Sequence, residues 1–361
     1  MRLSPGRSVA AGMMNLRSLW VLVILVVSGT FGCASGPQEE TFSSEPVDPI
    51  LYKQRMRDLV IAISRQARAD NPEFIVIPQN GNELLAADGK LGSPPALDYI
   101  QAIDGIGRED LFYGYSADNR ETPQEAIRYM LPYLKLAREK GLTVMVIDYC
   151  RQHPKIDESY GRNHREGFIS FAAPRRDLTV IPGYPDPVFA EHSGDVDSLA
   201  DARNFLFLIN PEAFSDKERF LTALRRTNYD LIVIDAFVDG SRGPEWLEAE
   251  DIRSLKQKAG GGRRLVICYL SIGEAESYRY YWDRDWDRNR DGRPDAGAPE
   301  WLAGENPNWE GNYKVRYWDE GWQAILFGSE ESYLDQILSR GFDGVYLDII
   351  DAFEYFEQHG P

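Results

Sequence analysis

Short apolar runs recur along the chain, and stretches of helical periodicity separate them. Most runs are apolar throughout instead of alternating with polar residues, which is typical of parallel strands covered on both faces. Eight of these runs predict a (β/α)8 barrel: Phe74–Ile77, Ala102–Ile106, Thr143–Ile147, Phe205–Ile209, Leu231–Ile234, Leu265–Leu270, Lys314–Tyr317 and Val345–Leu347. We interpret a ninth run, Gly167–Ala173, as an excursion after the third strand, although it could displace another strand from the eight.

The two ends of the chain indicate an unusual order of elements. An amphipathic helix precedes the first strand. Its apolar face consists of Met56, Leu59, Val60, Ile63 and Ala67. Only a few residues follow the last strand, whereas a barrel needs a helix after its final strand. We therefore expect the helix over residues 51–69 to pack there, with strand 345–347 beside strand 74–77. The predicted fold is a circularly permuted (β/α)8 TIM barrel of the α/β class, formed by one domain.

Polar residues directly follow several of the strands, at the end where a barrel has its active site. They are Gln79, Asp148, Asn210, Asp235, Ser271 and Asp348. The rival fold, a doubly wound open sheet that binds a nucleotide, requires a glycine-rich phosphate loop between a strand and a helix. The sequence contains no such loop, no nucleophile elbow and no histidines with metal-ligand spacing. Carboxylates are therefore the candidates for the chemistry.

Two carboxylates are expected at the same end of the barrel. Asp348 follows the last strand, whereas Asp343 precedes it and so belongs to the opposite, stabilising end. Glu109 reaches the rim of Asp348 from the next-but-one strand of a closed barrel. Such strands place carboxylates about 5 to 9 Å apart, the range in which glycosidases hold a nucleophile or base and a proton donor. The alternative is that Glu109 pairs with an arginine such as Arg108 and that Asp348 caps a helix.

At these residues the chain resembles a known family, the extracellular glycoside hydrolases related to the endo-α-1,4-polygalactosaminidases (glycoside hydrolase family 114 and its relatives). The matching stretches span nearly all of the chain after its N-terminal segment. They are Ile77–Gly81, Arg108–Tyr113, Val146–Tyr149, Asn204–Asn210, Ile234–Phe237, Cys268–Arg279, Asn312–Trp318 and Gly341–Asp351. The resemblance implies a (β/α)8 barrel, a permuted order of elements in this chain, and a catalytic pair formed by Asp348 and Glu109.

The expected mechanism is hydrolysis of a glycosidic bond by these two carboxyl groups. Asp348 is the nucleophile, or the base towards water, and Glu109 is the acid that protonates the leaving oxygen, which requires partial desolvation. Glu274 is the alternative acid. The candidates for holding sugar hydroxyls or amines are Gln79, Asn80, Asp148, Asp235, Tyr269, Glu274, Arg279 and Asp351. The candidates for stacking on sugar rings are Tyr113, Tyr149, Trp282 and Trp318.

The N-terminal segment has the pattern of a signal peptide. Arginines precede a short apolar run over residues 19–27, and small residues follow it, so residues 1–32 are predicted to be a lipoprotein signal peptide. Gly32 before Cys33 resembles a bacterial lipoprotein box, and we expect Cys33 to be acylated, with ordinary secretion as the alternative. Ala34 implies the outer membrane. Residues 33–49 are predicted to be a flexible tether, and residues 50–361 the barrel domain.

The net charge of the chain limits the classes of molecule that it is expected to bind. A net charge of −17 argues against nucleic acid, whose recognition needs clustered lysine and arginine. Removal of residues 1–32, which contain three arginines and no acidic residue, would bring −17 to −20. Such a surface attracts cationic polymers, and this favours an amino-sugar polysaccharide of the galactosamine type as substrate. We expect a monomer that touches the membrane only through its lipid and needs no cofactor for catalysis.

One loop has the pattern of a calcium site. Oxygen-bearing side chains occupy positions 1, 3, 5 and 9 of a calcium loop, with Gly292 at position 6. They are Asp287, Asn289, Asp291 and Asp295. Ala298 stands where the bidentate glutamate is expected, so a solvated polar turn is the alternative to a structural Ca²⁺. Apart from Cys33, Cys150 and Cys268 are expected to be buried, unpaired thiols.

Two other functions compete with the glycosidase. The first is a surface lipoprotein that binds glycans without turnover, in which the barrel keeps its cleft. The second is a metal-dependent hydrolase of another ester or amide, whose activity a chelator would abolish.

Overall fold

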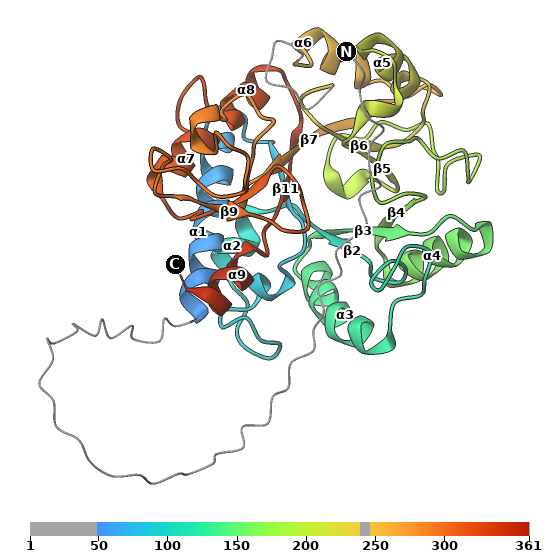
Figure 1. Cartoon of the computed structure of the whole chain (residues 1–361). Coiled ribbons are helices and arrows are strands. Elements are labelled where there is room, and N and C mark those ends of the chain that lie inside the picture. Colours follow the sequence, from blue (N-terminus) through green and yellow to red (C-terminus); the bar gives the residue numbers. More distant parts are fainter. Residues whose placement is uncertain (1–48, 239–245, 361) are drawn as a thin grey trace, which may run out of the picture.

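The computed structural model describes residues 49–238 and 246–360 (Figure 1). The predicted signal peptide of residues 1–32, Cys33 and nearly all of the predicted tether of residues 33–49 lie outside the described residues. Within the described ranges, no helix combines the length and apolar character needed to cross a membrane. The described residues form a mixed α/β fold built on parallel sheets.

Eight of the described strands pair with their neighbours in parallel. They are β1 (Ile75–Pro78), β2 (Gly105–Glu109), β3 (Thr143–Tyr149), β4 (Ile169–Ala173), β5 (Phe205–Leu208), β6 (Leu231–Ile234), β7 (Leu265–Ser271) and β11 (Gly344–Asp348). One sheet has the order β1-β11-β7-β6-β5 and the other the order β2-β3-β4. Most of their side chains are buried on both faces, which explains why the runs are apolar throughout.

The two parallel sheets adjoin each other at both edges. Gln79, directly after β1, forms a parallel bridge with Gly107 of β2. At the other edge β4 contacts β5, where the rings of Phe171 and Phe205 lie 6.0 Å apart. These junctions bring the carboxyl ends of strands from both sheets to a common region.

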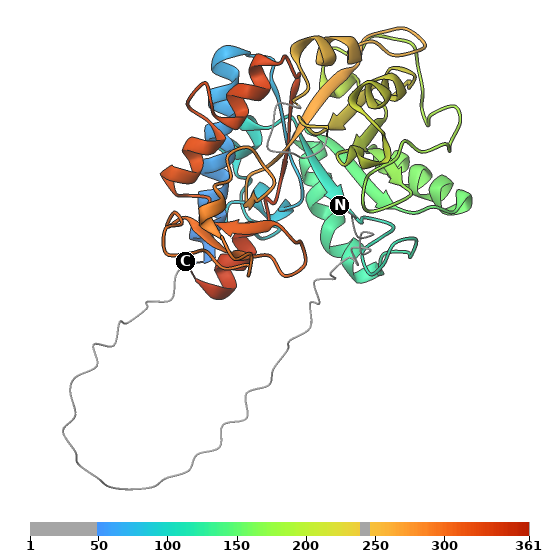
Figure 2. The same ribbon diagram turned by 45° about the horizontal axis from the view of Figure 1, so that its top comes forward.

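Helices surround the strands (Figures 1 and 2). They are α1 (Pro49–Asp70), α2 (Leu97–Ala102), α3 (Gln124–Glu139), α4 (His153–Glu166), α5 (Lys217–Arg225), α6 (Ala249–Leu255), α7 (Glu320–Leu326), α8 (Tyr333–Ser339) and α9 (Ala352–His359). Short 3-10 turns are η1 (Asn82–Leu85), η2 (Leu199–Asp201), η3 (Pro211–Ala213) and η4 (Arg284–Trp286). The apolar face predicted for the first helix, from Met56 to Ala67, is buried in α1.

Two of the nine apolar runs differ from their predicted roles. The run 167–173 contains β4, which is a parallel strand and no excursion. The run 314–317 instead overlaps β10 (Asn312–Val315), which lies in an antiparallel sheet with β8 (Glu274–Glu276) and β9 (Leu302–Glu305). The prediction of Lys314–Tyr317 as a barrel strand was therefore wrong. Half-buried and buried residues alternate along β10, as expected for a strand with one covered face.

The two ends of the described chain lie side by side. A helix that the sequence reading did not expect, α9, follows β11, and α1 packs against it. The ring of Tyr52 lies 5.7 Å from that of Phe356, and Lys53 forms an ion pair with Glu357. β1 and β11 are parallel neighbours, as the sequence predicted, with Val76 opposite Val345.

Candidate active site

The alternation of side chains along β11 and β2 directs both Asp348 and Glu109 to the interior between the two parallel sheets. The strand predicted over Ala102–Ile106 is displaced in the structure, where β2 covers Gly105–Glu109. Glu109 is therefore the last residue of β2, just as Asp348 is the last residue of β11. Residues two apart on a strand share a face, so Tyr346 faces the same side as Asp348, and Gly107 the same side as Glu109. A β-carbon at Gly107 would come within 1.9 Å of the Tyr346 hydroxyl. The two carboxyl groups therefore lie one layer above the Tyr346–Gly107 contact.

The layer below the carboxyl groups is packed with side chains. The ring of Phe207 on β5 meets the ring of Tyr346 on β11 edge to face, with the ring centroids 4.9 Å apart. β6 and β7 separate these two strands in the sheet, so this contact crosses the interior. Asp348 and Glu109 thus lie at the carboxyl ends of the strands, directly above a layer of packed side chains.

Glu109 is held by donors from two neighbouring strands. Tyr149 at the end of β3 donates its hydroxyl hydrogen to Oε1. Gln79 donates through Nε2 to Oε2 at 3.0 Å, and Asn80 Nδ2 lies 3.5 Å from the same oxygen. Asn80 adopts a φ of 62°, a left-handed conformation that asparagine tolerates better than most residues, and its Oδ1 accepts the Glu109 amide at 3.3 Å. Three sequence-predicted site residues therefore meet at Glu109.

Asp348 is held in a similar way from β7. The hydroxyl of Tyr269 donates to its Oδ2 at 2.7 Å, and the amide of Ile349 donates to its Oδ1 at 2.8 Å. Burial first, and then the negative charge of Glu109, raise the pKa of Asp348 to about 7, although both hydrogen bonds act in the opposite direction. The two carboxyl groups are therefore within electrostatic reach of each other, and simultaneous ionisation of both is disfavoured.

Two further acidic residues extend the site. Burial raises the pKa of Asp351 to about 6, where Arg108 acts against the rise and Glu109 and Glu274 add to it. Glu274 on β8 is buried, and its carboxylate accepts hydrogen bonds from Asn306 at 2.8 Å, from Asn312 at 3.3 Å and from Lys314 at 3.3 Å. Glu274 thus lies beside the site with a lysine partner.

Asp235 and Arg279 bind each other. The guanidinium group of Arg279 forms hydrogen bonds with both Asp235 oxygens, at 2.9 and 2.8 Å, and with Glu276 Oε2 at 2.6 Å. All three side chains are buried. Glu276, which the sequence reading did not single out, thus completes a buried ion-pair triad that joins the end of β6 to β8. Asp235 and Arg279 therefore use their charges on each other and on Glu276.

Asp148 occupies a structural position. Its carboxylate has no exposed surface, and Oδ1 accepts the amides of Phe112 and Tyr113 at 2.8 and 3.1 Å. Oδ2 accepts Ser159 at 2.7 Å and Asn163 at 3.1 Å, both from α4. Tyr149, the next residue, points to Glu109, so Asp148 faces the opposite side of β3. These four bonds fasten the loop after β2 to α4 and leave no acceptor for a sugar.

The predicted stacking residues lie in different places. Tyr149 joins the carboxyl pair, whereas the hydroxyl of Tyr113 donates to Glu158 on α4 at 2.9 Å. Trp318 packs against Tyr52 and Phe356, with ring centroids 5.3 and 4.7 Å away, and is part of the contact between α1 and α9. The fourth, Trp282, packs within a cluster of aromatic rings next to β10. Of the four predicted stacking residues, only Tyr149 therefore lies beside Asp348 and Glu109.

In the predicted calcium loop, the candidate ligand side chains accept hydrogen bonds from backbone amides of the loop itself. Both oxygens of Asp287 accept backbone amides, from Asp291 at 3.2 Å and from Gly292 at 2.9 Å. Asn289 Oδ1 accepts the Asp291 amide, and Asp295 Oδ2 accepts the amide of Arg288 at 2.8 Å. In the described part of the chain, no three His, Cys, Asp or Glu side chains are grouped so as to hold a metal ion. Calcium binding by this loop stays a prediction.

The two cysteines are buried and free, as predicted. Burial raises the pKa of both the Cys150 and the Cys268 thiol, which keeps them neutral. Neither thiol is suited to act as a nucleophile.

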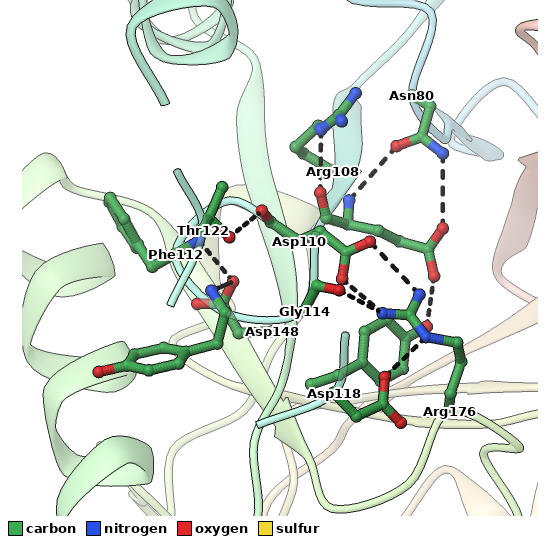
Figure 3. Close-up of polar contacts among 12 residues, drawn as sticks. Asn80, Arg108, Asp110, Phe112, Gly114, Asp118, Thr122, Asp148 and Arg176 are labelled. Carbon is green, nitrogen blue, oxygen red and sulfur yellow. Dashed lines mark hydrogen bonds and ion pairs between the residues drawn. The ribbon is translucent and has the colours of Figure 1, made fainter. Parts of the chain in front are cut away.

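Sequence reasoning missed a side chain that reaches the site from the loop after β4. Figure 3 shows Arg176 between Asp110, Gly114 and Asp118. Its guanidinium group also lies over the ring of Tyr149, 3.7 Å from the centroid. Because the run before this loop was interpreted as an excursion, nothing in the sequence placed its residues at the active end of the strands.

Comparison with known proteins finds similarity over parts of the chain. Residues 220–360 match the family model of Glycoside-hydrolase family GH114. An uncharacterized protein of Methanocaldococcus jannaschii is 47% identical over 173 residues, which is 45% of each chain. Uncharacterized proteins of Deinococcus radiodurans and Thermotoga maritima are 42% and 40% identical over 134 residues, which is 37% of this chain and 37% and 36% of theirs. The matches thus span less than half the length of these relatives.

A solved endoglucanase aligns with 57% of this chain and 62% of its own, at 18% identity and a TM-score of 0.20, which is too low to carry an argument. The family match includes Asp348, whereas Glu109 lies before its first residue. The resemblance to the GH114-like glycoside hydrolases is therefore confirmed over residues 220–360.

Proposed function

We propose that the protein is an exported glycoside hydrolase that cleaves a polysaccharide, with Asp348 and Glu109 as its catalytic pair. The observation that carries this proposal is the pKa of Asp348, raised to about 7 by burial and by the charge of Glu109. Near neutral pH Asp348 is then partly protonated beside a second carboxyl group, which suits hydrolysis by one acid and one nucleophile or base. The family match over residues 220–360 supports the same reaction class.

The proposal includes closure of the eight parallel strands into a circularly permuted (β/α)8 barrel. The bridge at β1 and β2 and the contact of β4 with β5 support closure. The position of α1, which precedes β1 and packs beside α9, supports the permuted order. In such a barrel Asp348 and Glu109 stand on next-but-one strands around the rim, with β1 between them.

The division of roles follows from where the proton resides. The family resemblance implies that Asp348 is the nucleophile or base and Glu109 the acid. A carboxyl with a pKa of about 7 is half protonated at neutral pH, so Asp348 can itself donate a proton without first receiving one. The raised pKa thus favours the reverse assignment, in which Glu109, placed by Tyr149 and Gln79, attacks the sugar or activates water.

A leaving-group experiment separates the two assignments. A variant without the proton donor keeps turnover on a dinitrophenyl oligosaccharide, whose leaving group needs no proton, but loses it on the natural linkage. A variant without the nucleophile or base loses turnover on both. If Asp348 donates the proton, Asp348→Asn is the variant that the activated substrate rescues. If Glu109→Gln is rescued instead, the family assignment holds.

The charge of the chain supports a cationic substrate. The net charge is −17, and Asp351 lies beside the pair as a further carboxyl. A de-N-acetylated amino-sugar polymer, such as one of galactosamine, matches a site of this sign. The proposal also includes lipid attachment at Cys33, an outer-membrane location and a monomeric protein, all as the sequence predicts. A structural Ca²⁺ in the loop from Asp287 to Asp295 is a separate expectation.

The test is incubation with de-N-acetylated galactosamine polymers. Wild-type protein is expected to release oligosaccharides, while Asp348→Asn and Glu109→Gln bind the polymer without releasing them. Binding without release by every variant, wild type included, would favour the alternative of a non-catalytic glycan-binding surface lipoprotein. Activity that a chelator abolishes would favour a metal-dependent hydrolase.

A further inference from the structure

We propose that Arg176 is the positioning residue for Glu109, acting through Tyr149 and Asp110. The inference rests on the proposed function, because it assigns a role in orienting one of the two catalytic carboxyl groups. Arg176 lies in the loop after β4, distant in sequence from Glu109. It contacts both the residue that follows Glu109 and the ring that donates to Glu109.

The first contact controls the side chain of Glu109. The Arg176 guanidinium group lies over the ring of Tyr149 at 3.7 Å from the centroid, a cation–π arrangement. The hydroxyl of that ring donates to Glu109 Oε1. Burial, followed by the charge of Glu109, raises the pKa of Tyr149, while Arg176 acts to lower it. Tyr149 therefore stays a neutral donor, and the stacked guanidinium group fixes the ring that aims it.

The second contact controls the backbone next to Glu109. Asp110 has a φ of 61°, which is unfavourable for most residues, and its carboxylate binds Arg176 through two hydrogen bonds of 2.8 and 3.3 Å. A β-carbon at Gly114 would lie 2.0 Å from Asp110 Oδ1 and 3.0 Å from Arg176 Nη2, so a glycine there allows the pair to form. Arg176 thus holds the turn at which β2 ends.

A third set of contacts anchors Arg176 itself. Its Nε donates to Asp118 Oδ1 at 2.8 Å, and its Nη2 donates to the carbonyl of Gly114 at 3.1 Å (Figure 3). Arginine presents its donors in a rigid planar fork, so these bonds and the stacking on Tyr149 together define one orientation. Lysine keeps the charge but can reproduce neither the fork nor the stacked plane.

The charges around Glu109 give Arg176 an electrostatic effect besides its geometric one. Besides burial, the negative charge of Glu109 raises the pKa of Asp110, Tyr149, Tyr346, Asp348 and Asp351. The cations that act on the same groups are Arg176, on Asp110 and Tyr149, and Arg108, on Asp110, Tyr346 and Asp351. Removing Arg176 takes away a cation and leaves Asp110 without its partner. Both changes disfavour negative charge on the catalytic pair, so the pH dependence of turnover is expected to move to higher pH.

Four variants separate geometry from charge. Arg176→Ala removes both, Arg176→Lys removes the geometry only, and Arg176→Ala with Asp110→Asn also removes the stranded anion. Arg175→Ala is the matched control, because Arg175 is the adjacent residue, is exposed and pairs with Asp177 at 2.5 Å. Each full-length protein is assayed for kcat, KM and the pH profile on the polymer that wild-type protein cleaves.

We expect Arg176→Lys to lower kcat by about 10- to 100-fold, because small misplacements of a catalytic group cost up to about that factor. KM stays within about twofold, since Arg176 is argued to act through other residues and not on the substrate. Arg176→Ala lowers kcat as much and moves both limbs of the pH profile to higher pH. The double variant returns the limbs towards the wild-type pH without restoring kcat. Arg175→Ala matches wild type in every measurement.

A readout that needs no turnover accompanies the kinetics. In protein labelled with ¹³C at glutamate, the side-chain carboxyl resonance of Glu109 is assigned by its loss in Glu109→Gln. It is expected to shift in Arg176→Lys and to stay in place in Arg175→Ala. An unchanged resonance together with wild-type kcat in Arg176→Lys would overturn the positioning role. Absence of hydrolysis by wild-type protein would instead overturn the proposed function, and the resonance would still decide on Arg176.

Discussion

The two ends of the parallel strands treat their carboxylates in opposite ways. At the amino ends, an aspartate precedes each of β2, β6 and β11, and each pairs with a cation. The pairs are Asp104 with Arg68 at 2.7 Å, Asp230 with Lys258 at 2.9 Å and Asp343 with Lys256 at 2.7 Å. Each aspartate also accepts a backbone amide next to it. The donors are Val76 at 2.8 Å, Arg203 at 2.9 Å and Val266 at 2.9 Å.

Asp348 and Glu109, at the carboxyl ends of β11 and β2, lack such a cationic partner, although other carboxylates at these ends, such as Asp235 and Asp110, have one. Neither Asp348 nor Glu109 forms an ion pair with any residue in the described ranges. Instead they lie within electrostatic range of each other, and the charge of Glu109 contributes to the raised pKa of Asp348. The difference teaches that one end of the fold uses its carboxylates for stability, whereas the other keeps two like groups close at a cost in stability. Such a cost is expected where a protein carries out chemistry.

The largest effect is expected from changing one aspartate at the active end. Asp348→Asn removes the ionisable group while keeping its shape, so kcat on the cleaved polymer should fall by about 100- to 10,000-fold, the range for loss of a catalytic acid or base. The matched control is Asp343→Asn, the same change at the other end of the same strand. Its kcat should equal that of wild type. Equal losses in both variants would erase the functional distinction between the two ends.

The next largest effect is expected at the amino end, on stability. Lys258 and Asp230 have fully buried side chains, and Lys258 also donates to the carbonyls of His192 and Gly194 at 2.9 and 2.7 Å. Lys258→Met leaves Asp230 as a buried charge without its lysine, which should lower the free energy of unfolding by about 3 to 5 kcal/mol. Urea denaturation measures this loss, and kcat of the folded fraction should not change. A loss below about 1 kcal/mol would contradict the comparison.

The third prediction concerns how the free energy of unfolding depends on pH through Asp348 at the carboxyl end of β11. The pKa of Asp348 rises from 3.8 to about 7 on folding, so the native state binds more protons than the unfolded state between these values. Its contribution to stability is therefore fully present below pH 3.8 and is lost as the pH rises through about 7. Relative to wild type, the unfolding free energy of Asp348→Asn should therefore rise by about 2 to 3 kcal/mol between pH 5 and pH 8. A constant difference in urea denaturation across these pH values would show that Asp348 is not strained.

The sequence sufficed for most of the parallel strands and for the end at which the pair lies. Strands covered on both faces are apolar throughout, and this signal marks them wherever they occur in the chain. Because such a strand is apolar at every position, its sequence has no alternation that would show which side chains point to the interior. Asp148 and Tyr149 are adjacent on β3, yet only the tyrosine reaches Glu109. The sequence could not tell one from the other.

Contacts made by loops were beyond sequence reasoning for a different reason. Arg176 and Asp110 lie far apart in the chain, and their ion pair depends on where β4 places the loop that follows it. That placement in turn required recognising β4 instead of β10 as a parallel strand. The alternation of polar and apolar residues from Asn312 to Val315 was the available signal, and it corresponds to the alternating burial along β10. Long-range pairing decides such cases, and a single sequence does not encode it in any local pattern.

The smallest effect is expected at the amino end of β11. Asp343 accepts Lys256 Nζ at 2.7 Å and the Val266 amide at 2.9 Å, and its side chain is 14% exposed while that of Lys256 is 29% exposed. Asparagine can still accept the amide, so Asp343→Asn loses only a partly solvated ion pair and should cost about 1 kcal/mol in unfolding free energy. Urea denaturation at low and at high salt checks this, because screening should shrink the cost. A cost as large as that of Lys258→Met would mean that the amino-end aspartates act as one network, since an isolated pair with this exposure cannot contribute so much.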